Sequence, residues 1–146
     1  MKQTHVMKDH EQRLIDRGIR VTAVRLLVFQ AMLTHPSAFS LADLEEKLDS
    51  VDKSTLSRAI RLFHEKLLIH SIDDGSGSIK YSVCDSACSC RLDDLHVHFY
   101  CTRCKHTRCL EQIAIPSVSL PPGFALESVN FVLKGLCDKC SKSRKC

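Results

Sequence analysis

Two pairs of cysteines have the spacing of a metal knuckle. Cys101 and Cys104 form the first pair and Cys137 and Cys140 the second, with two residues inside each pair. This gap lets both thiolates of a pair reach one ion, and two pairs supply the four thiolates of a closed tetrahedral zinc site. Such a site has no open position for a substrate, so we expect a structural role. The alternative is that one pair acts as a redox-active dithiol.

A pair of histidines precedes the first knuckle. Residues 95–99 read leucine, histidine, valine, histidine, phenylalanine, and in a β-strand His96 and His98 would face the same side. Two imidazoles on one face make half of a metal site without distorting the backbone. The alternative is a pair of ordinary surface histidines, and the neighbouring cysteines favour metal binding.

The cysteines are unevenly distributed along the 146 residues. All nine lie at or after Cys84, which predicts two parts with different chemistry. No apolar run approaches the roughly 20 residues of a membrane span, and the polar start lacks the apolar stretch of a secretion signal. We therefore expect a cytoplasmic protein with no membrane contact, whose cysteines serve metal binding or redox chemistry. The net charge of +4 permits nucleic-acid binding but does not require it.

The first half has the periodicity of four helices. We expect a helix over 6–17 ended by Gly18, a second helix capped by Thr22, a third after Ser40 and a fourth over 54–67. Two short helices with a tight link are typical of a helix-turn-helix, whose second helix enters the major groove of DNA. The candidates for DNA contact are the polar side chains near the start of that helix: Lys53, Ser54, Thr55, Ser57, Arg58 and Arg61.

Two strands are expected after the last of these helices. They cover 68–73 and 78–83 and flank a flexible tip, so that a hairpin would complete a winged helix. The alternative is a helical bundle with an ordinary solvated face, because helix-turn-helix patterns also occur by chance. Further on, residues 125–133 predict an apolar strand that either pairs with its copy in a second chain or lies inside a small sheet.

The order of these motifs resembles the ferric uptake regulator family over residues 14–140. Each motif is weak alone, but their order and spacing together are specific. They are Arg17-Gly18-Ile19-Arg20-Val21-Thr22 with Arg25, Ser40-Leu41-Ala42-Asp43-Leu44, Ser54-Thr55-Leu56-Ser57-Arg58, Tyr81-Ser82-Val83, the His-x-His pair and the two knuckles, with Gly135 before the second. The family implies a homodimer whose regulatory metal lies at a hinge and fixes the spacing of two DNA-binding domains.

The resemblance also implies roles for single residues. Arg20 corresponds to the basic residue that approaches the minor groove. Ser57 and Arg58 occupy the positions of a tyrosine–arginine pair on the recognition helix. The serine removes the tyrosine's apolar contact with bases, whereas Arg58 can still contact a base or a phosphate.

The sensing site resembles the zinc-responsive branch of the family more than the iron-responsive one. Val129 stands where the iron pattern has a strand histidine, and Ser82 and Cys109 replace two of its glutamates. Imidazoles with one thiolate suit tetrahedral zinc. The ligands implied by the zinc branch are His70, Cys84, His96 and His98.

Two features depart from the family pattern. Pro116, Pro121 and Pro122 disfavour the helix that normally packs on the C-terminal sheet. Additional cysteines follow Cys84, and either of the first two could replace it as a ligand or take part in redox chemistry. The cysteines without an assigned role are Cys88, Cys90, Cys109 and Cys146.

We therefore predict an α+β protein with three parts. A winged helix-turn-helix DNA-binding domain covers 1–84, a hinge covers 85–94, and a small α/β zinc-bound dimerisation domain covers 95–146. About two zinc ions per chain are expected, one structural and one regulatory. The predicted function is that of a repressor, not an enzyme, which binds a palindromic operator in double-stranded DNA as a homodimer and controls metal homeostasis genes. The alternatives are an iron- or manganese-responsive regulator and a thiol-based peroxide sensor on the same scaffold.

Overall fold

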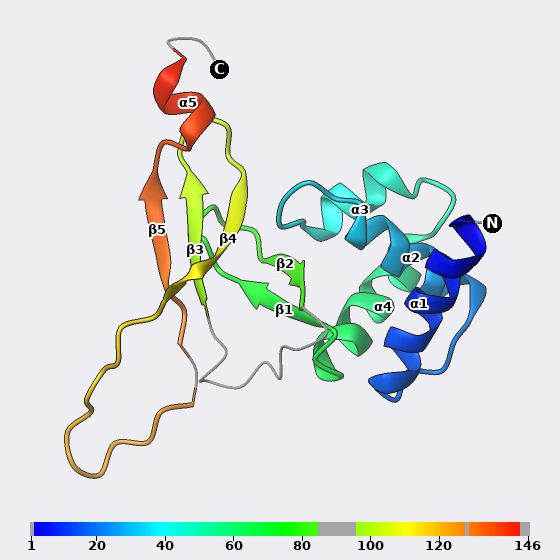
Figure 1. Cartoon of the computed structure of the whole chain (residues 1–146), viewed down its shortest axis with the longest axis horizontal. Helices are drawn as coiled ribbons and strands as arrows, with labels where there is room; N and C mark the ends of the chain where they lie inside the picture. Colours follow the sequence, from blue (N-terminus) through cyan, green and yellow to red (C-terminus); the bar gives the residue numbers. More distant parts are fainter. Residues whose placement is uncertain (1, 85–95, 128, 144–146) are drawn as a thin grey trace.

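The structure, a computed structural model, describes residues 2–84, 96–127 and 129–143 and has an α+β fold. The predicted hinge lies outside these residues. Figure 1 shows the first four helices at one end, a three-stranded sheet at the other, and a β-hairpin between them. The elements in chain order are α1 (Lys2–Asp16), α2 (Ala23–Leu33), α3 (Leu41–Lys47), α4 (Lys53–Glu65), β1 (Ile69–Ile72), β2 (Lys80–Val83), β3 (His96–Cys101), β4 (Thr107–Ala114), β5 (Val132–Gly135) and α5 (Asp138–Lys142).

The predicted end of the first helix and the predicted starts of the second and third are confirmed by their capping contacts, whereas the first helix begins earlier than predicted, at Lys2. Gly18 follows α1 with a φ of 66°, the left-handed conformation that ends helices and that favours glycine. The side chain of Thr22 accepts a hydrogen bond from the backbone N–H of Arg25 at the start of α2. Before α3, Ser40 and Asp43 form a reciprocal capping box. Local sequence therefore determines where these helices begin and end.

Helix α4 is buried along one side, as its periodicity predicts. Leu56, Ile60 and Phe63 are buried in the core of the helical part. Leu67 continues the same helical spacing, but it is 44% exposed. The helix ends at Glu65 and Leu67 adopts a φ of 57°, so the helical phase is lost and the following leucine is buried instead.

The β1–β2 hairpin is part of the same core. Ile69 of β1 is fully buried in the cluster that holds Phe29 and Phe63, whose rings meet edge to face at 6.1 Å. Phe39, in the link between α2 and α3, forms a β-bridge with Tyr81 of β2. The hairpin is thus fixed to the helices at both of its strands.

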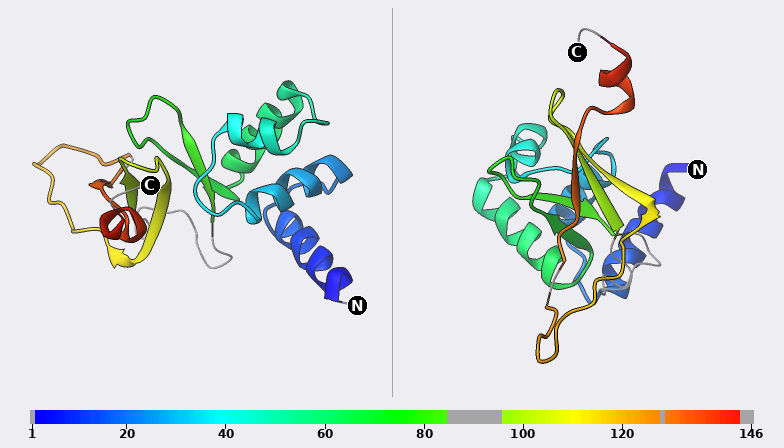
Figure 2. Two further views of the ribbon diagram at one scale, coloured as in Figure 1. Left: turned by 90° about the horizontal axis from the view of Figure 1, so that it is seen from above. Right: turned by 90° about the vertical axis from the view of Figure 1, so that its left-hand side faces the viewer.

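The second sheet has the strand order β4-β3-β5. Strands β3 and β4 are antiparallel, and their register places His98 opposite Cys109 and Tyr100 opposite Thr107. Strand β5 runs parallel to β3 at the edge of the sheet. The views in Figure 2 show β3, β4 and β5 grouped together, with α5 beyond them near the C-terminus.

A long connection without helix joins β4 to β5. Within its described residues, 115–127 and 129–131, the chain has turns and irregular backbone but no helix, as the three prolines predict. The strand expected over 125–133 begins only at Val132. Residues before it find no partner strand within the described chain, apart from the Phe131 carbonyl, which accepts from the His98 N–H.

The C-terminal sheet has a small core. Its buried cluster consists of three cysteines, with Phe99 and Cys104 partly buried beside them. Many apolar side chains on this sheet and on the β4–β5 connection are exposed instead: Ile113, Val118, Leu120, Phe124, Leu126, Leu133 and Leu136. None of the helices in the described part of the chain has the length and apolarity needed to cross a bilayer.

Candidate metal centre

The structure gathers two groups of metal-ligating side chains. The first holds four cysteines and the second three histidines and one cysteine, and within each group the ligand atoms all lie within 4.8 Å of one another. The first lies at one end of the C-terminal sheet, next to α5, whereas the second lies where the hairpin meets that sheet. The four-cysteine group consists of Cys101, Cys104, Cys137 and Cys140.

The four-cysteine group is positioned by the ends of two parallel strands. Cys101 is the last residue of β3 and pairs with Gly135 of β5, two residues before Cys137. The second knuckle continues into α5, for which Cys137 is the N-cap. The Cys104 and Cys137 Sγ atoms are 3.9 Å apart, and a tetrahedral zinc ion with bonds of about 2.3 Å separates two thiolates by about 3.8 Å. The group therefore fits the ion that its spacing predicts.

The surroundings of this group favour a thiolate at Cys101. Backbone N–H groups of Cys104 and Cys137 donate to the Cys101 sulfur and lower the pKa of this thiol to about 6. Three of the four are free thiols, whereas Cys140 is disulfide-bonded. Zinc ligation by Cys140 thus requires reducing conditions.

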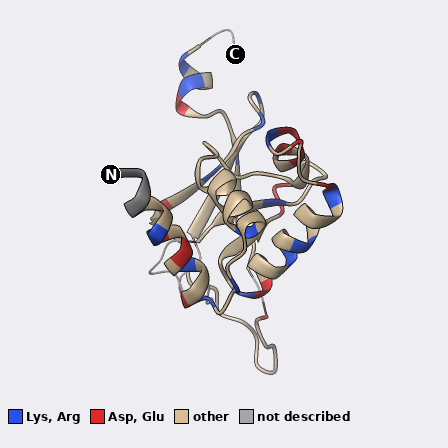
Figure 3. Cartoon of the chain, turned by 90° about the vertical axis from the view of Figure 1, so that its right-hand side faces the viewer, with Lys and Arg blue, Asp and Glu red and all other residues tan. Residues whose placement is uncertain are grey.

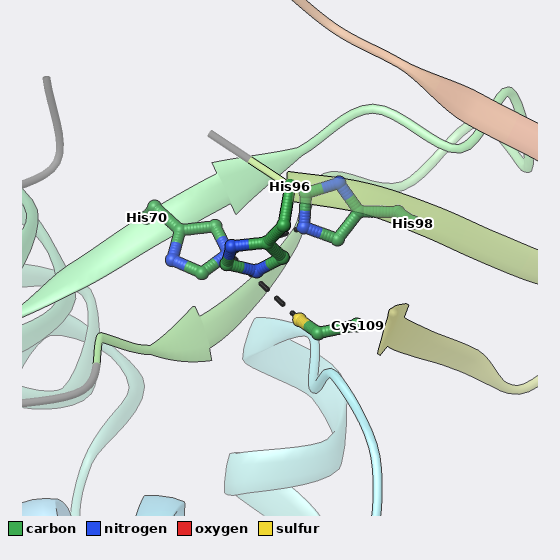
Figure 4. Close-up of side chains that lie close together, drawn as sticks. All are labelled: His70, His96, His98 and Cys109. Carbon is green, nitrogen blue, oxygen red and sulfur yellow. Dashed lines mark hydrogen bonds between the residues drawn. The ribbon is translucent and has the colours of Figure 1, made fainter. Parts of the chain in front are cut away.

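The second group joins the two parts of the molecule. His70 comes from β1 of the hairpin, His96 and His98 from β3, and Cys109 from β4. Figure 4 shows the four side chains converging. The Nε2 atoms of His70 and His98 are 3.2 Å apart, and the Cys109 sulfur lies 4.0 Å from His70 Nε2.

These distances fit a tetrahedral zinc site. Zinc bonds of about 2.0–2.1 Å to nitrogen place two imidazole nitrogens about 3.3 Å apart, close to the separation of His70 and His98. Among the described residues, the buried Nε2 atom of His96 and the buried Nδ1 atom of His98 have no hydrogen-bond partner. A buried nitrogen without a partner is costly, and a metal ion on His96 Nε2 would remove that cost.

Two histidines of this group, His70 and His98, are held neutral, as metal ligands must be. Burial, together with the neighbouring histidine rings, lowers the pKa of His70 to about 4. Burial and the ring of His96 likewise lower the pKa of His98 to about 4. At neutral pH both rings therefore offer a lone pair without first losing a proton.

The structure places Cys84 differently from the sequence prediction. It brings Cys109, not Cys84, together with the three histidines. Cys84 is buried directly after β2, and its sulfur lies 3.4 Å from Nδ1 of His70. The two ring nitrogens of an imidazole point in different directions, so Cys84 contacts the nitrogen of His70 that faces away from His98.

Sequence reasoning left Cys109 without a role, although a signal was available. An antiparallel hairpin centred on the Cys101–Cys104 knuckle pairs Tyr100 with Thr107, and the same register pairs His98 with Cys109. Extending the hairpin by two residues would therefore have placed this thiol beside the histidine.

The predicted DNA-contacting residues lie on or near the outer side of α4. Lys53, Arg58 and Arg61 are exposed on this helix, and Arg20 is exposed just before α2. Ser57 is half-buried and lines a shallow hollow between α4 and Tyr81. Figure 3 faces the helical side, where Lys and Arg recur along the helices among acidic residues. The structure thus leaves these basic side chains accessible.

The first turn of α4 is occupied by its own cap. The hydroxyls of Ser54 and Thr55 donate to the carboxylate of Asp52 at 2.5 and 2.7 Å. These hydrogen bonds, with one from the Thr55 backbone, hold the pKa of Asp52 well below its usual range. The two hydroxyls are therefore already engaged, and the arginines are the better donors to DNA.

Comparison with known proteins gives matches among solved structures only: no family model and no curated protein matches the chain. A zinc uptake regulator complexed with zinc and DNA matches with a TM-score of 0.68 at 20% identity, covering 97% of each chain. The structure of holo XcZur matches with a TM-score of 0.69 at 18% identity, covering 95% of this chain and 99% of the other. The Vibrio cholerae ferric uptake regulator matches with a TM-score of 0.59 at 19% identity, covering 87% and 98%. The chain therefore has the fold of the ferric and zinc uptake regulators.

Proposed function

We propose that the chain is a zinc-responsive transcriptional repressor of the ferric uptake regulator family, which acts in the cytoplasm on metal homeostasis genes. Helices α1–α4 and the β1–β2 hairpin form its winged helix-turn-helix domain, and the C-terminal sheet its dimerisation domain. The observation that carries the proposal is that the His70, His96, His98 and Cys109 group takes ligands from both parts. An ion bound there selects the relative orientation in which all four ligands meet.

The donor atoms support zinc over manganese, and the group lacks the carboxylate that accompanies two histidines in the common non-haem iron(II) site. Three imidazoles and one thiolate make a nitrogen–sulfur set, which tetrahedral zinc accepts, whereas manganese prefers oxygen. Neutral His70 and His98 bind without proton release, and Cys109 supplies the negative charge. Burial raises the pKa of the Cys109 thiol, so this sulfur must lose its proton to the solvent as the ion binds. Bound zinc supplies a rigid connection and no reaction.

The four-cysteine group supports a second, structural zinc. The C-terminal sheet buries few apolar side chains other than its cysteines. A domain with so small a core needs an additional cross-link, and a structural zinc ion provides one. We therefore propose about two zinc ions per chain, of which the interdomain ion is the sensed one.

The remaining surface features support a dimer formed with a second copy of the chain. Strand β5 is at the edge of its sheet, and the connection that precedes it exposes the apolar side chains of Phe124 (70%) and Val118 (68%). Apolar side chains gathered on one part of a surface mark an interface. Two copies related by a two-fold axis would present two α4 helices to the half-sites of a palindromic operator.

The test is DNA binding across buffered free zinc. A duplex selected from a random pool with the zinc-loaded protein serves as the probe, and fluorescence anisotropy at fixed salt under reducing conditions gives the affinity. We expect affinity to rise with zinc and to fall when a mild chelator empties the interdomain site. His96→Ala should abolish the zinc dependence, whereas His106→Ala, an exposed histidine in the turn between β3 and β4, should retain it.

The same assay separates the alternatives. Affinity that follows iron(II) or manganese(II), but not zinc, contradicts the zinc assignment and keeps the fold assignment. Affinity lost on peroxide treatment without loss of metal supports a thiol-based sensor. If the selection recovers no bound duplex under any metal condition, the proposal of a DNA-binding regulator is contradicted.

A further inference from the structure

A buried ion pair lies in the β1–β2 hairpin that carries His70. Asp74 follows β1 and is fully buried, and Lys80 begins β2. The Lys80 Nζ atom is 2.8 Å from Asp74 Oδ2, and its side chain is only 12% exposed. Thr107 of β4 donates its hydroxyl to the same carboxylate oxygen at 2.6 Å. This ion pair of the hairpin therefore extends onto the C-terminal sheet.

The carboxylate of Asp74 and the ammonium of Lys80 have hydrogen-bond partners for all of their charged atoms. The Lys80 ammonium has three acceptors, because it also donates to the Lys105 carbonyl at 3.0 Å and to the Thr107 hydroxyl at 3.3 Å. The second oxygen of Asp74 accepts from the Ser76 N–H. Burial alone would raise the pKa of Asp74, but hydrogen bonds from Lys80, Ser76 and Thr107 outweigh it and hold this pKa well below its usual range. The carboxylate is thus a permanent anion at neutral pH.

Lys80 and Thr107 lie two residues along the β1–β2 and β3–β4 ladders from the strand pairs that hold metal ligands. In the hairpin, His70 pairs with Ser82, and two residues on Ile72 pairs with Lys80. In the C-terminal sheet, His98 pairs with Cys109, and two residues on Tyr100 pairs with Thr107.

The β1–β2 hairpin packs on the β3–β4 strands so that each of these residue pairs in one contacts the corresponding pair in the other. His70 meets His98, and Ser82 meets the Cys109 sulfur at 3.4 Å. At the next pair, Lys80 meets Thr107 and lies 5.1 Å from the centre of the Tyr100 ring. A slip of one such step, about 7 Å along a strand, would remove His70 from its neighbours.

We propose that Asp74, Lys80 and Thr107 form an interdomain latch that fixes this docking register and so positions His70 against His98 and Cys109. The latch needs no metal, because all its contacts are made by the chain itself. It orders the interdomain ligands before the ion arrives, which lowers the cost of binding. The inference rests on the proposed function for the metal site, whereas the latch contacts themselves do not.

Further contacts hold the same end of the hairpin. The Asn130 side chain donates to the Asp73 carbonyl at 2.8 Å. Gly75 approaches Lys134 of β5 so closely that an added Cβ would lie 2.5 Å from its Nζ atom. The hairpin tip is therefore packed against β5 and the connection before it, as well as against β4.

The test compares Asp74→Asn with Asp73→Asn, in protein whose four-cysteine site is loaded and whose interdomain site is empty. Both substitutions remove one carboxylate charge from the same loop, but Asp73 is exposed. The first readout is amide exchange at Ala38, whose N–H donates to the Thr107 carbonyl across the interface. The second readout is the Kd for cobalt(II) at the interdomain site, from its thiolate absorption band.

We expect Asp74→Asn to speed exchange at Ala38 and to weaken cobalt(II) binding by about 10-fold or more, and Asp73→Asn to change neither. Thr107→Val removes both hydrogen bonds of the Thr107 hydroxyl and keeps the side-chain shape. It should act in the same direction, and it tests the proposal if Asp74→Asn does not fold. Wild-type values in both Asp74→Asn and Thr107→Val would overturn the latch. If the wild-type protein binds no cobalt(II) at the interdomain site, the proposed metal site is contradicted. The rate of amide exchange at Ala38 in the variants then still tests the latch, because that readout needs no metal.

Discussion

His70 lies between two thiols, and the two contacts are not equivalent. Its Nε2 atom faces His98 and Cys109, whereas its Nδ1 atom faces the buried Cys84. A ligating histidine commonly uses its second nitrogen to hold its orientation. At the scale of the residue, we therefore propose Cys109 as the thiolate ligand and Cys84 as the group that orients the imidazole.

Serine substitutions distinguish these roles. Cys109→Ser should remove the thiolate absorption band of cobalt(II) at the interdomain site and weaken zinc binding by about 100-fold or more, because a direct ligand is lost. Cys84→Ser should keep the band and weaken zinc binding by about 10-fold, because a hydroxyl can still orient Nδ1. A band lost in Cys84→Ser and kept in Cys109→Ser would restore the ligand set predicted from sequence.

The lowered pKa values of His70 and His98 predict a pH dependence of stability. In the unfolded chain each ring has an ordinary pKa near 6.5 and binds a proton below it, whereas the folded rings stay neutral down to about 4. The unfolded state therefore binds more protons across this window. With the interdomain site empty, the melting temperature should fall as the pH drops from about 6.5 to about 4. The double variant His70→Gln, His98→Gln should lose this part of the dependence; an unchanged pH profile contradicts the burial argument.

At the scale of the element, the sequence predicted what is decided locally. The caps Thr22 and Ser40, the end at Gly18 and the hairpin after α4 all depend on a few adjacent residues, and the structure has them. The late start of β5 depends on which strand is available to pair, and no local pattern reports that. The burial of Asp74 was equally invisible, because a loop sequence with glycines predicts exposure and Thr107 is far away in the chain.

Helix α4 is the element that the proposed function assigns to DNA. Arg58→Ala should weaken binding to the selected duplex by about 10-fold and lower the slope of log affinity against log salt if the lost contact is to phosphate. The control is Lys66→Ala, which removes an exposed charge just after the end of the same helix. Equal affinity and equal salt slope for Arg58→Ala and the wild type would remove this helix from the interface.

The C-terminal sheet is the element that depends on the four-cysteine site. Cys101→Ser should unfold β3–β5 while α1–α4 keep their own apolar core, because structural zinc contributes directly to folding. Amide exchange measured separately over the two parts is the check. Equal protection of β3 in the variant and in the wild type contradicts a structural role for this site.

At the scale of the whole molecule, a single chain leaves its C-terminal apolar surface uncovered. Phe124→Asp places a charge where the proposed second copy packs, and should raise the dimer dissociation constant by at least about 10-fold in sedimentation equilibrium. Ile15→Asp is the matched control, since Ile15 is 54% exposed on α1 at the far end of the molecule. A dimer as tight in Phe124→Asp as in the wild type would place the interface elsewhere.

The parallel pairing of β3 with β5 has a consequence for how the chain matures. Parallel strands joined by a long connection form slowly, because the connection must close before any contact repays the entropy. Both knuckles lie at the same end of these two strands, since Cys101 pairs with Gly135. A zinc ion held first by Cys101 and Cys104 on a newly synthesised chain would let Cys137 and Cys140 bind as soon as they come within reach. If the proposed structural zinc is bound there, the rate at which new chains mature would follow the cell's supply of zinc.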